Sequence, residues 1–76
     1  MGTLSNIKIS VFRDFLGAQG LCYKDTTGGH EKWIKKGLLR PVIFQTHIDP
    51  VPISVLKNNL RTIGCTTQNL IDFLNK

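Results

Sequence analysis

The chain has 76 residues, with ten Lys and Arg against five Asp and Glu, and a formal net charge of +5 at neutral pH. This length allows one domain over residues 1–76 with a thin core, so it excludes a deep pocket enclosed on all sides. A hydrophobic content of 41% favours a globular domain over a disordered one. The basic charge favours a polyanion, above all a nucleic acid, as the partner, rather than a merely soluble basic protein.

The sequence shows no sign of a membrane segment or an export signal. No apolar run approaches the roughly 18 residues of a spanning helix, and no segment joins a basic face to a long apolar stripe. Residues 1–10 lack the basic and apolar regions of a signal peptide. We therefore expect a cytoplasmic protein with no membrane partner, in which residues 1–6 are partly frayed.

Cys22 and Cys65 are too few and too far apart for a disulfide scaffold or a CxxC site. A zinc site built from both cysteines, His30 and His47 would match no known ligand spacing. Free thiols that pack as small apolar side chains are the favoured interpretation. We expect neither a metal ion nor another cofactor.

The first part of the chain predicts a helix and a hairpin. Ser10 is a good N-cap residue, and Gly20 is placed to follow the end of the helix. Residues 21–25 predict a strand, residues 26–29 a turn in which two glycines permit positive φ, and residues 30–36 the returning strand. The apolar positions at helical spacing are Val11, Phe12, Phe15 and Leu16.

The middle of the chain predicts a third strand and a second helix. Gly37 marks a turn, residues 40–45 read as the strand, and residues 46–51 form a loop rich in turn-forming residues. Pro52 fits the first turn of the helix and Gly64 the position after its end. The apolar stripe of this helix consists of Ile53, Leu56, Leu60 and Ile63.

Thr66 or Thr67 can cap a last short helix that carries Leu70, Ile71 and Leu74. Tight turns between the strands predict an antiparallel meander. Both main helices must cover the same sheet face to bury their apolar stripes. This α+β architecture leaves the other sheet face and the turns available for function.

His30, directly after the Gly28-Gly29 turn, is one of two histidines. The ordinary pKa of histidine lies near neutrality, so it can take a proton from a 2′-hydroxyl and give one to a leaving oxygen. The two glycines expose backbone N–H groups and let a phosphate come close. A lone histidine at a strand start is more often a surface residue, so the residues alone leave catalysis open.

Basic residues surround the predicted hairpin. They either form a solvated strand face or bind phosphates, and Trp33 either stacks on a base or packs in the core. The parity of the strand places Trp33 opposite His30, under the helices if His30 faces solvent. The predicted RNA-binding residues are Lys24, Lys32, Lys35, Lys36, Arg40, Lys57 and Arg61.

Motifs from about Ser10 to Leu74 occur in a recognisable order. They are Phe12-x-x-Phe15-Leu16-x-x-x-Gly20, then Thr27-Gly28-Gly29-His30-Glu31-Lys32-Trp33, a strand leading to His47 and Pro52, and Leu56-Lys57-x-x-Leu60-Arg61-x-x-Gly64. This order resembles the HicA family of mRNA interferase toxins. Its most specific element is the Gly-x-His start of the second strand.

The resemblance implies a fold similar to the double-stranded-RNA-binding domain, α-β-β-β-α with the helices on one sheet face. It implies the toxin of a type II toxin–antitoxin pair, which cleaves mRNA without the ribosome or a metal and is neutralised by a HicB-type antitoxin. The family's catalytic histidine falls on His30, and Gly29 replaces the Ser often found before it. His47 matches a loop histidine seen in many members.

The resulting hypothesis makes His30 the base that activates the 2′-hydroxyl. Gly29 N–H, Lys32 or Lys24 stabilises the phosphorane, and the acid remains open among His30 itself, His47 and water. A non-catalytic RNA-binding module of the same fold is the alternative. A DNA-binding accessory domain is less favoured, because no helix-turn-helix pair with a basic recognition helix is evident.

Overall fold

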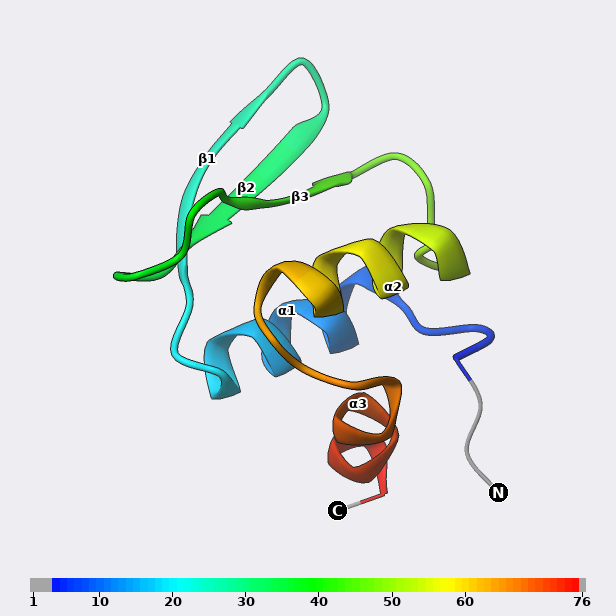
Figure 1. Ribbon diagram of the computed structural model, residues 1–76. Coiled ribbons are helices and arrows are strands. Elements are labelled where there is room, and N and C mark those ends of the chain that lie inside the picture. Colours follow the sequence, from blue (N-terminus) through cyan, green and yellow to red (C-terminus); the bar gives the residue numbers. More distant parts are fainter. Residues whose placement is uncertain (1–3, 76) are drawn as a thin grey trace.

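Six elements follow one another in the predicted order, as Figure 1 shows for the computed structural model, which describes residues 4–75. They are α1 (Ile9–Ala18), β1 (Cys22–Thr27), β2 (His30–Ile34), β3 (Val42–Gln45), α2 (Ile53–Thr62) and α3 (Thr67–Leu74). The strands form an antiparallel sheet of order β1-β2-β3, which confirms the predicted α+β class and the meander. The fraying expected for residues 1–6 lies partly outside the described residues, and Leu4 is buried.

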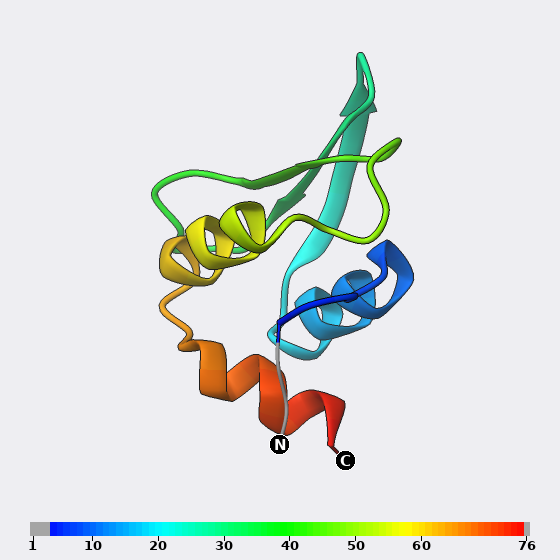
Figure 2. The same ribbon diagram turned by 90° about the vertical axis from the view of Figure 1, so that its right-hand side faces the viewer.

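The core lies between one face of the sheet and the helices. Figures 1 and 2 show all three helices on that side, with α3 farthest from the sheet. Phe12 meets Phe44 edge to face at 5.4 Å between ring centroids, and Phe15 meets Phe73 in the same way at 5.4 Å. These aromatic contacts join β3 through α1 to α3. The side chains with almost no exposure are Phe12, Phe15, Leu16, Val42, Leu56, Leu60 and Leu70.

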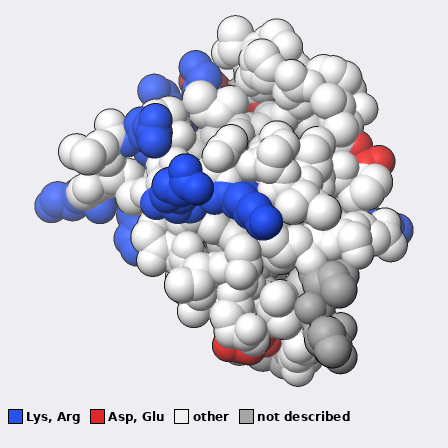
Figure 3. Space-filling model, turned by 45° about the vertical axis from the view of Figure 1, so that its right-hand side comes forward, with Lys and Arg blue, Asp and Glu red and all other residues white. Residues whose placement is uncertain are grey.

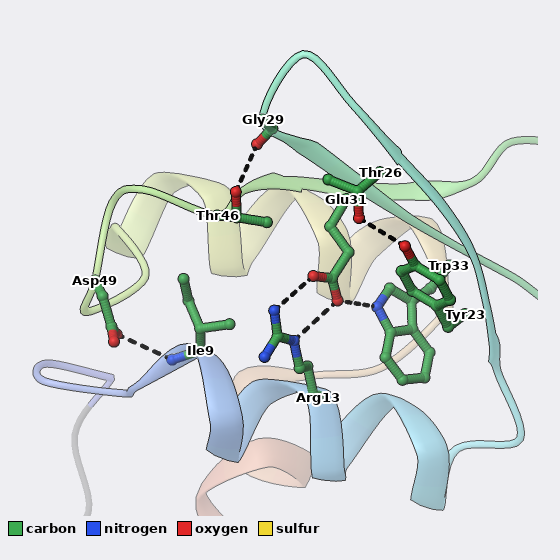
Figure 4. Close-up of polar contacts among 9 residues, drawn as sticks. All are labelled: Ile9, Arg13, Tyr23, Thr26, Gly29, Glu31, Trp33, Thr46 and Asp49. Carbon is green, nitrogen blue, oxygen red and sulfur yellow. Dashed lines mark hydrogen bonds and ion pairs between the residues drawn. The ribbon is translucent and has the colours of Figure 1, made fainter.

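The N-terminus of α1 differs from the prediction that Ser10 would cap it. The helix begins at Ile9, and its N-cap, Lys8, makes no side-chain capping bond. The backbone N–H of Ile9 donates to Asp49 Oδ1 at 3.0 Å, from the loop before α2 (Figure 4). The prediction was wrong because a side chain distant in sequence satisfies an N–H that the local sequence leaves free.

The other helix ends follow local signals. Gly20 and Gly64 occupy the positions after the C-caps of α1 and α2, as predicted. The N–H of the residue after each glycine donates to a carbonyl in the last turn of the helix, at 3.0 Å for α1 and 2.9 Å for α2. Pro52 is the N-cap of α2 rather than part of its first turn. Thr66 caps α3 in a reciprocal capping box with Asn69.

A β-bulge changes the direction of side chains in β1. Tyr23 pairs with Trp33, and Asp25 pairs with Lys32, so Lys24 is the extra residue. Without the bulge, Tyr23 would share the outer face of the sheet with Asp25. It lies instead on the inner face, edge to face with Trp33 at 6.1 Å.

Candidate nucleic-acid interface

His30 begins β2 directly after a two-residue turn. Thr27 pairs with His30 across the hairpin, which leaves Gly28 and Gly29 as the turn, with φ of +59° and +79°. A type I′ hairpin turn requires positive φ at both of these positions, which glycine adopts without a steric penalty. The Thr-Gly-Gly-His sequence therefore fixes where β2 starts.

The outer face of the sheet carries the exposed His30 ring. Thr27 in β1 and Gln45 in β3 are its direct cross-strand partners, and paired residues share a sheet face. Gln45 Nε2 lies 3.3 Å from His30 Nε2. An amide nitrogen only donates, so the ring nitrogen is the acceptor in this contact. Gln45 therefore orients the imidazole.

An open hollow of about 340 Å³ lies beside His30, between β3 and the start of α2. Its lining includes Ile43 and Gln45 from β3, and Ser54 and Val55 from α2. The hollow gives a substrate room to approach the imidazole from the side of α2.

His47 lies at the same end of the sheet. A Cβ placed on Gly29 would lie 3.3 Å from His47 Nδ1, so the ring packs against the turn that precedes His30. Thr46 holds the Gly29 carbonyl with its backbone N–H at 2.8 Å and its hydroxyl at 3.2 Å (Figure 4). The structure thus places the His47 ring against the glycine that precedes His30.

The predicted basic residues separate into groups. Lys32 lies two residues beyond His30 on the same face, opposite Asp25 in β1 and Ile43 in β3. Lys24 is exposed at the bulge of β1. One carboxylate oxygen of Asp25, Oδ1, is buried without a hydrogen-bond partner among the described residues. Because residues two apart in a strand lie on the same face, Lys32 is the predicted cation that lies on the same sheet face as His30.

Lys35 points elsewhere. Its Nζ donates to the backbone carbonyl of Gln19, the C-cap of α1, at 2.9 Å. A cation at that position stabilises a helix C-terminus, so the contact is structural. Lys36 is exposed in the loop after β2.

Arg40 and Arg61 line a second open hollow, of about 400 Å³, together with Asn58. Lys57 lies one turn before Arg61 on the exposed side of α2. On the face drawn in Figure 3, most of the blue Lys and Arg atoms lie over the left half, with some at the right margin, and little red of Asp or Glu lies among them. The fold therefore brings cations from the β2–β3 loop and α2 to one surface.

An ion pair between exposed Arg13 and buried Glu31 lies on the opposite side of the sheet from His30. Glu31, only 3% exposed, accepts from Arg13 Nε at 3.0 Å, from Arg13 Nη2 at 2.7 Å and from Trp33 Nε1 at 2.6 Å (Figure 4). Burial alone would raise the pKa of Glu31, but the hydrogen bonds from Arg13 and Trp33 and the guanidinium charge outweigh it and lower that pKa. The pair holds β2 against α1. Trp33 lies on this inner face, as predicted for a solvent-facing His30.

Sequence reasoning missed Gln45, Arg13 and Asn59. The alternation of apolar and polar residues in β3 already places Gln45 on the outer face, and only the register with His30 was missing. Asn59 gives no local signal, yet its buried amide bonds both the N–H and the C=O of Ile43, at 3.4 and 2.9 Å. It thereby attaches α2 to β3 beside the site.

The cysteines differ in their surroundings. Cys22 is exposed on β1, so the expectation that it packs in the core was wrong. Cys65 is half-buried and its thiol lies 3.5 Å from Gln19 Oε1. Burial raises the pKa of the Cys65 thiol, and the nearby Lys35 charge only partly opposes this. Cys22 pairs with Ile34, so it shares the outer face with His30 but lies at the other end of β2.

No protein family, curated protein or solved structure matches the chain. Within residues 4–75, no helix is long and apolar enough to cross a membrane. The same residues contain no group of three or more His, Cys, Asp or Glu placed to hold a metal ion. The case for a function therefore depends on the His30 surface and its charges.

Proposed function

We propose that the protein is a HicA-type toxin, an mRNA endoribonuclease that acts without the ribosome or a metal and is neutralised by a HicB-like antitoxin. The observation that carries the proposal is the exposed imidazole of His30, oriented by Gln45 beside an open hollow, with Lys32 two residues along the same face. The α-β-β-β-α order with helices on one side of the sheet supports a similarity to the double-stranded-RNA-binding domain.

In the proposed reaction, the RNA lies on the outer face of the sheet. The 2′-hydroxyl displaces the Gln45 amide from His30 Nε2 and transfers its proton to that nitrogen. The 2′-oxygen then attacks the adjacent phosphorus, and the bond from phosphorus to the 5′-oxygen breaks. Lys32, two residues along the same face, stabilises the charge on the phosphorane.

The leaving 5′-oxygen needs a proton. His47 packs against Gly29, one residue from His30, so it is the second imidazole at this end of the sheet. In the proposed reaction it donates this proton to the leaving oxygen. The two alternative proton donors are His30 itself, in a second role, and water. A His47→Ala variant distinguishes them from His47.

The test measures cleavage and binding separately. Purified wild-type protein, His30→Ala and His47→Ala are incubated with mRNA in the absence of ribosomes, and affinity for RNA is followed by fluorescence anisotropy. We expect His30→Ala to bind RNA like the wild type and to lose at least about a hundredfold in rate. Cleavage by His30→Ala at the wild-type rate would overturn the assignment.

The alternative, an RNA-binding module without catalysis, is favoured by one observation. Among the described residues the His30 ring has an amide as its hydrogen-bond partner, and no carboxylate orients it. Such a module would bind RNA without cutting it, and its expression would leave growth unchanged. A toxin should arrest growth on induction, and a co-expressed antitoxin should relieve the arrest.

A further inference from the structure

The hollow lined by Arg40 and Arg61 is a site that the proposed chemistry at His30 does not use. Arg40 lies in the loop before β3 and Arg61 in the last turn of α2, so the fold brings together two cations 21 positions apart. Asn58 and Thr62 from α2 and Pro41 complete most of the lining. No acidic residue lines this hollow, and the one ion pair among the described residues lies elsewhere, between Arg13 and Glu31.

Guanidinium groups without carboxylate partners favour a phosphate. Each presents several N–H donors in a planar fork that matches two phosphate oxygens, and Asn58 adds an exposed amide. Thr62 contributes little, because its hydroxyl already donates to the Asn58 carbonyl at 3.1 Å. The hollow is therefore built from two arginines and one amide.

The position of this hollow relates it to His30. Both hollows include Ile43, whose exposed side chain separates them on the outer face of β3. Val42, the first residue of β3, lies about 10 Å along the strand from Gln45, which is opposite His30, and Arg40 precedes Val42 in the chain. This separation exceeds one nucleotide step, so a phosphate held here belongs to a different nucleotide from the one that is cut.

We infer that Arg40 and Arg61 form a phosphate subsite for an RNA strand that runs along β3 from His30, at least one nucleotide beyond the cleaved bond. The inference rests on the proposed function, since it assigns the strand's path relative to His30. It makes the two arginines binding residues for long substrates and leaves the chemistry to the other end of β3.

Binding is measured on the His30→Ala background, so that cleavage does not consume the probe, a fluorescein-labelled single-stranded RNA. Arg40→Gln and Arg61→Gln should each weaken binding about fivefold. The double variant should lower the slope of log affinity against log salt concentration by about 0.7, the value for one phosphate on a single strand. Lys8→Gln removes an exposed charge at the start of α1 and should change affinity by less than about twofold.

Cleavage gives a second readout in the His30 protein. The double variant should raise KM for the long RNA and leave kcat unchanged, and it should cleave a dinucleotide as the wild type does. Arg61→Lys keeps the charge without the planar fork, so it should fall between wild type and Arg61→Gln. Melting temperatures show whether the loss of a cation in the last turn of α2 has weakened the helix.

The outcomes distinguish the two proposals. If His30→Ala abolishes cleavage while the arginine variants bind RNA like their parent, the subsite is overturned and the proposed function stands. Equal losses for the arginine variants and Lys8→Gln would mean general charge attraction, which also overturns the subsite. If the arginine variants no longer bind an acidic peptide but bind RNA like their parent, the hollow is assigned to a protein partner and the RNA subsite is overturned. If the wild type neither binds nor cuts RNA, both proposals fail.

Discussion

Replacing Arg13 with methionine should destabilise the domain, because it leaves the Glu31 carboxylate without its cationic partner. The Glu31 side chain is 3% exposed and the Arg13 side chain 45%. Of the three donors to the carboxylate, two come from Arg13 and only Trp33 Nε1 remains in the variant. Methionine keeps an unbranched apolar stem, so the substitution removes charge and hydrogen bonds more than packing.

The expected loss of unfolding free energy is about 2 kcal/mol at neutral pH. Removing one partner of a fully buried ion pair costs about 3–5 kcal/mol. Solvent reaches nearly half of the Arg13 side chain, and Trp33 keeps its bond to Glu31, so the loss should lie below that range. Protonation of Glu31 limits the charge penalty, since taking up a proton at pH 7 from the ordinary pKa of 4.5 costs about 3.4 kcal/mol.

Urea unfolding, followed by the fluorescence of Trp33 and by far-UV circular dichroism, measures this loss. For a domain of this size, it corresponds to a fall in melting temperature of about 8–16 °C. Arg40→Met removes an exposed arginine and should change stability by less than about 0.5 kcal/mol. Adding Glu31→Gln to Arg13→Met should restore part of the loss, because the buried charge is gone and an amide oxygen still accepts from Trp33.

The pH dependence has opposite signs in the two proteins. In the wild type the pKa of Glu31 is lowered, so its contribution to stability is present above its unfolded pKa and is lost as the pH falls through that value and below. In Arg13→Met burial acts with much less opposition and raises that pKa. The folded variant then gains a proton before the unfolded chain does, and acidification from pH 7 towards about pH 5 stabilises it. The gap between the two proteins should narrow over this range.

Two results would refute this reasoning. One is an Arg13→Met protein that unfolds at the same urea concentration as Arg40→Met. The other is a difference between wild type and Arg13→Met that stays constant from pH 7 to about pH 5, because a buried unpaired carboxylate must respond to protons there.

Two further substitutions test how the surface around His30 is held. Asn59→Ala should lower the free energy of unfolding in urea by about 2 kcal/mol, because it leaves the N–H and C=O of Ile43 without a protein partner. Hydrogen exchange of the Ile43 amide should become faster for the same reason. An unchanged exchange rate would contradict this role of Asn59. Gly28→Ala and Gly29→Ala should each lower the free energy of unfolding by about 1–2 kcal/mol, because both residues have positive φ. Gly29→Ala should lower it further, because only at Gly29 does the new methyl group meet His47. The two alanine variants should unfold alike if the ring of His47 moves away freely.

The elements that sequence predicted well depend on short-range chemistry. Gly20 and Gly64 end helices through the positive φ of the residue after the C-cap. Gly28 and Gly29 form a hairpin turn whose backbone geometry the two residues themselves determine. These signals predicted the elements and the placement of Trp33 opposite His30, but not which of the two residues faces solvent.

The features that were missed depend on residues distant in sequence. Ser10 has the right side chain for an N-cap, but Asp49 reaches the first N–H of α1 and the helix starts earlier. Lys35 lies in the basic cluster of the sequence, yet the C-terminus of α1 takes its ammonium group. Tyr23 changes face because of a bulge that is visible only when β1 is paired with β2. None of these contacts follows from composition or periodicity, because each is made by tertiary packing.

The two edges of the sheet explain how an open sheet face can remain available to a ligand. A free strand edge presents unpaired N–H and C=O groups that another strand can use. At the β3 edge, Asn59 takes both backbone groups of Ile43 with one side-chain amide. At the β1 edge, the bulge at Lys24 interrupts the regular ladder and adds a charge, which disfavours pairing with a second sheet. Because strand addition is opposed at both edges, the outer face with His30 is left open to partners that contact its side chains rather than its backbone.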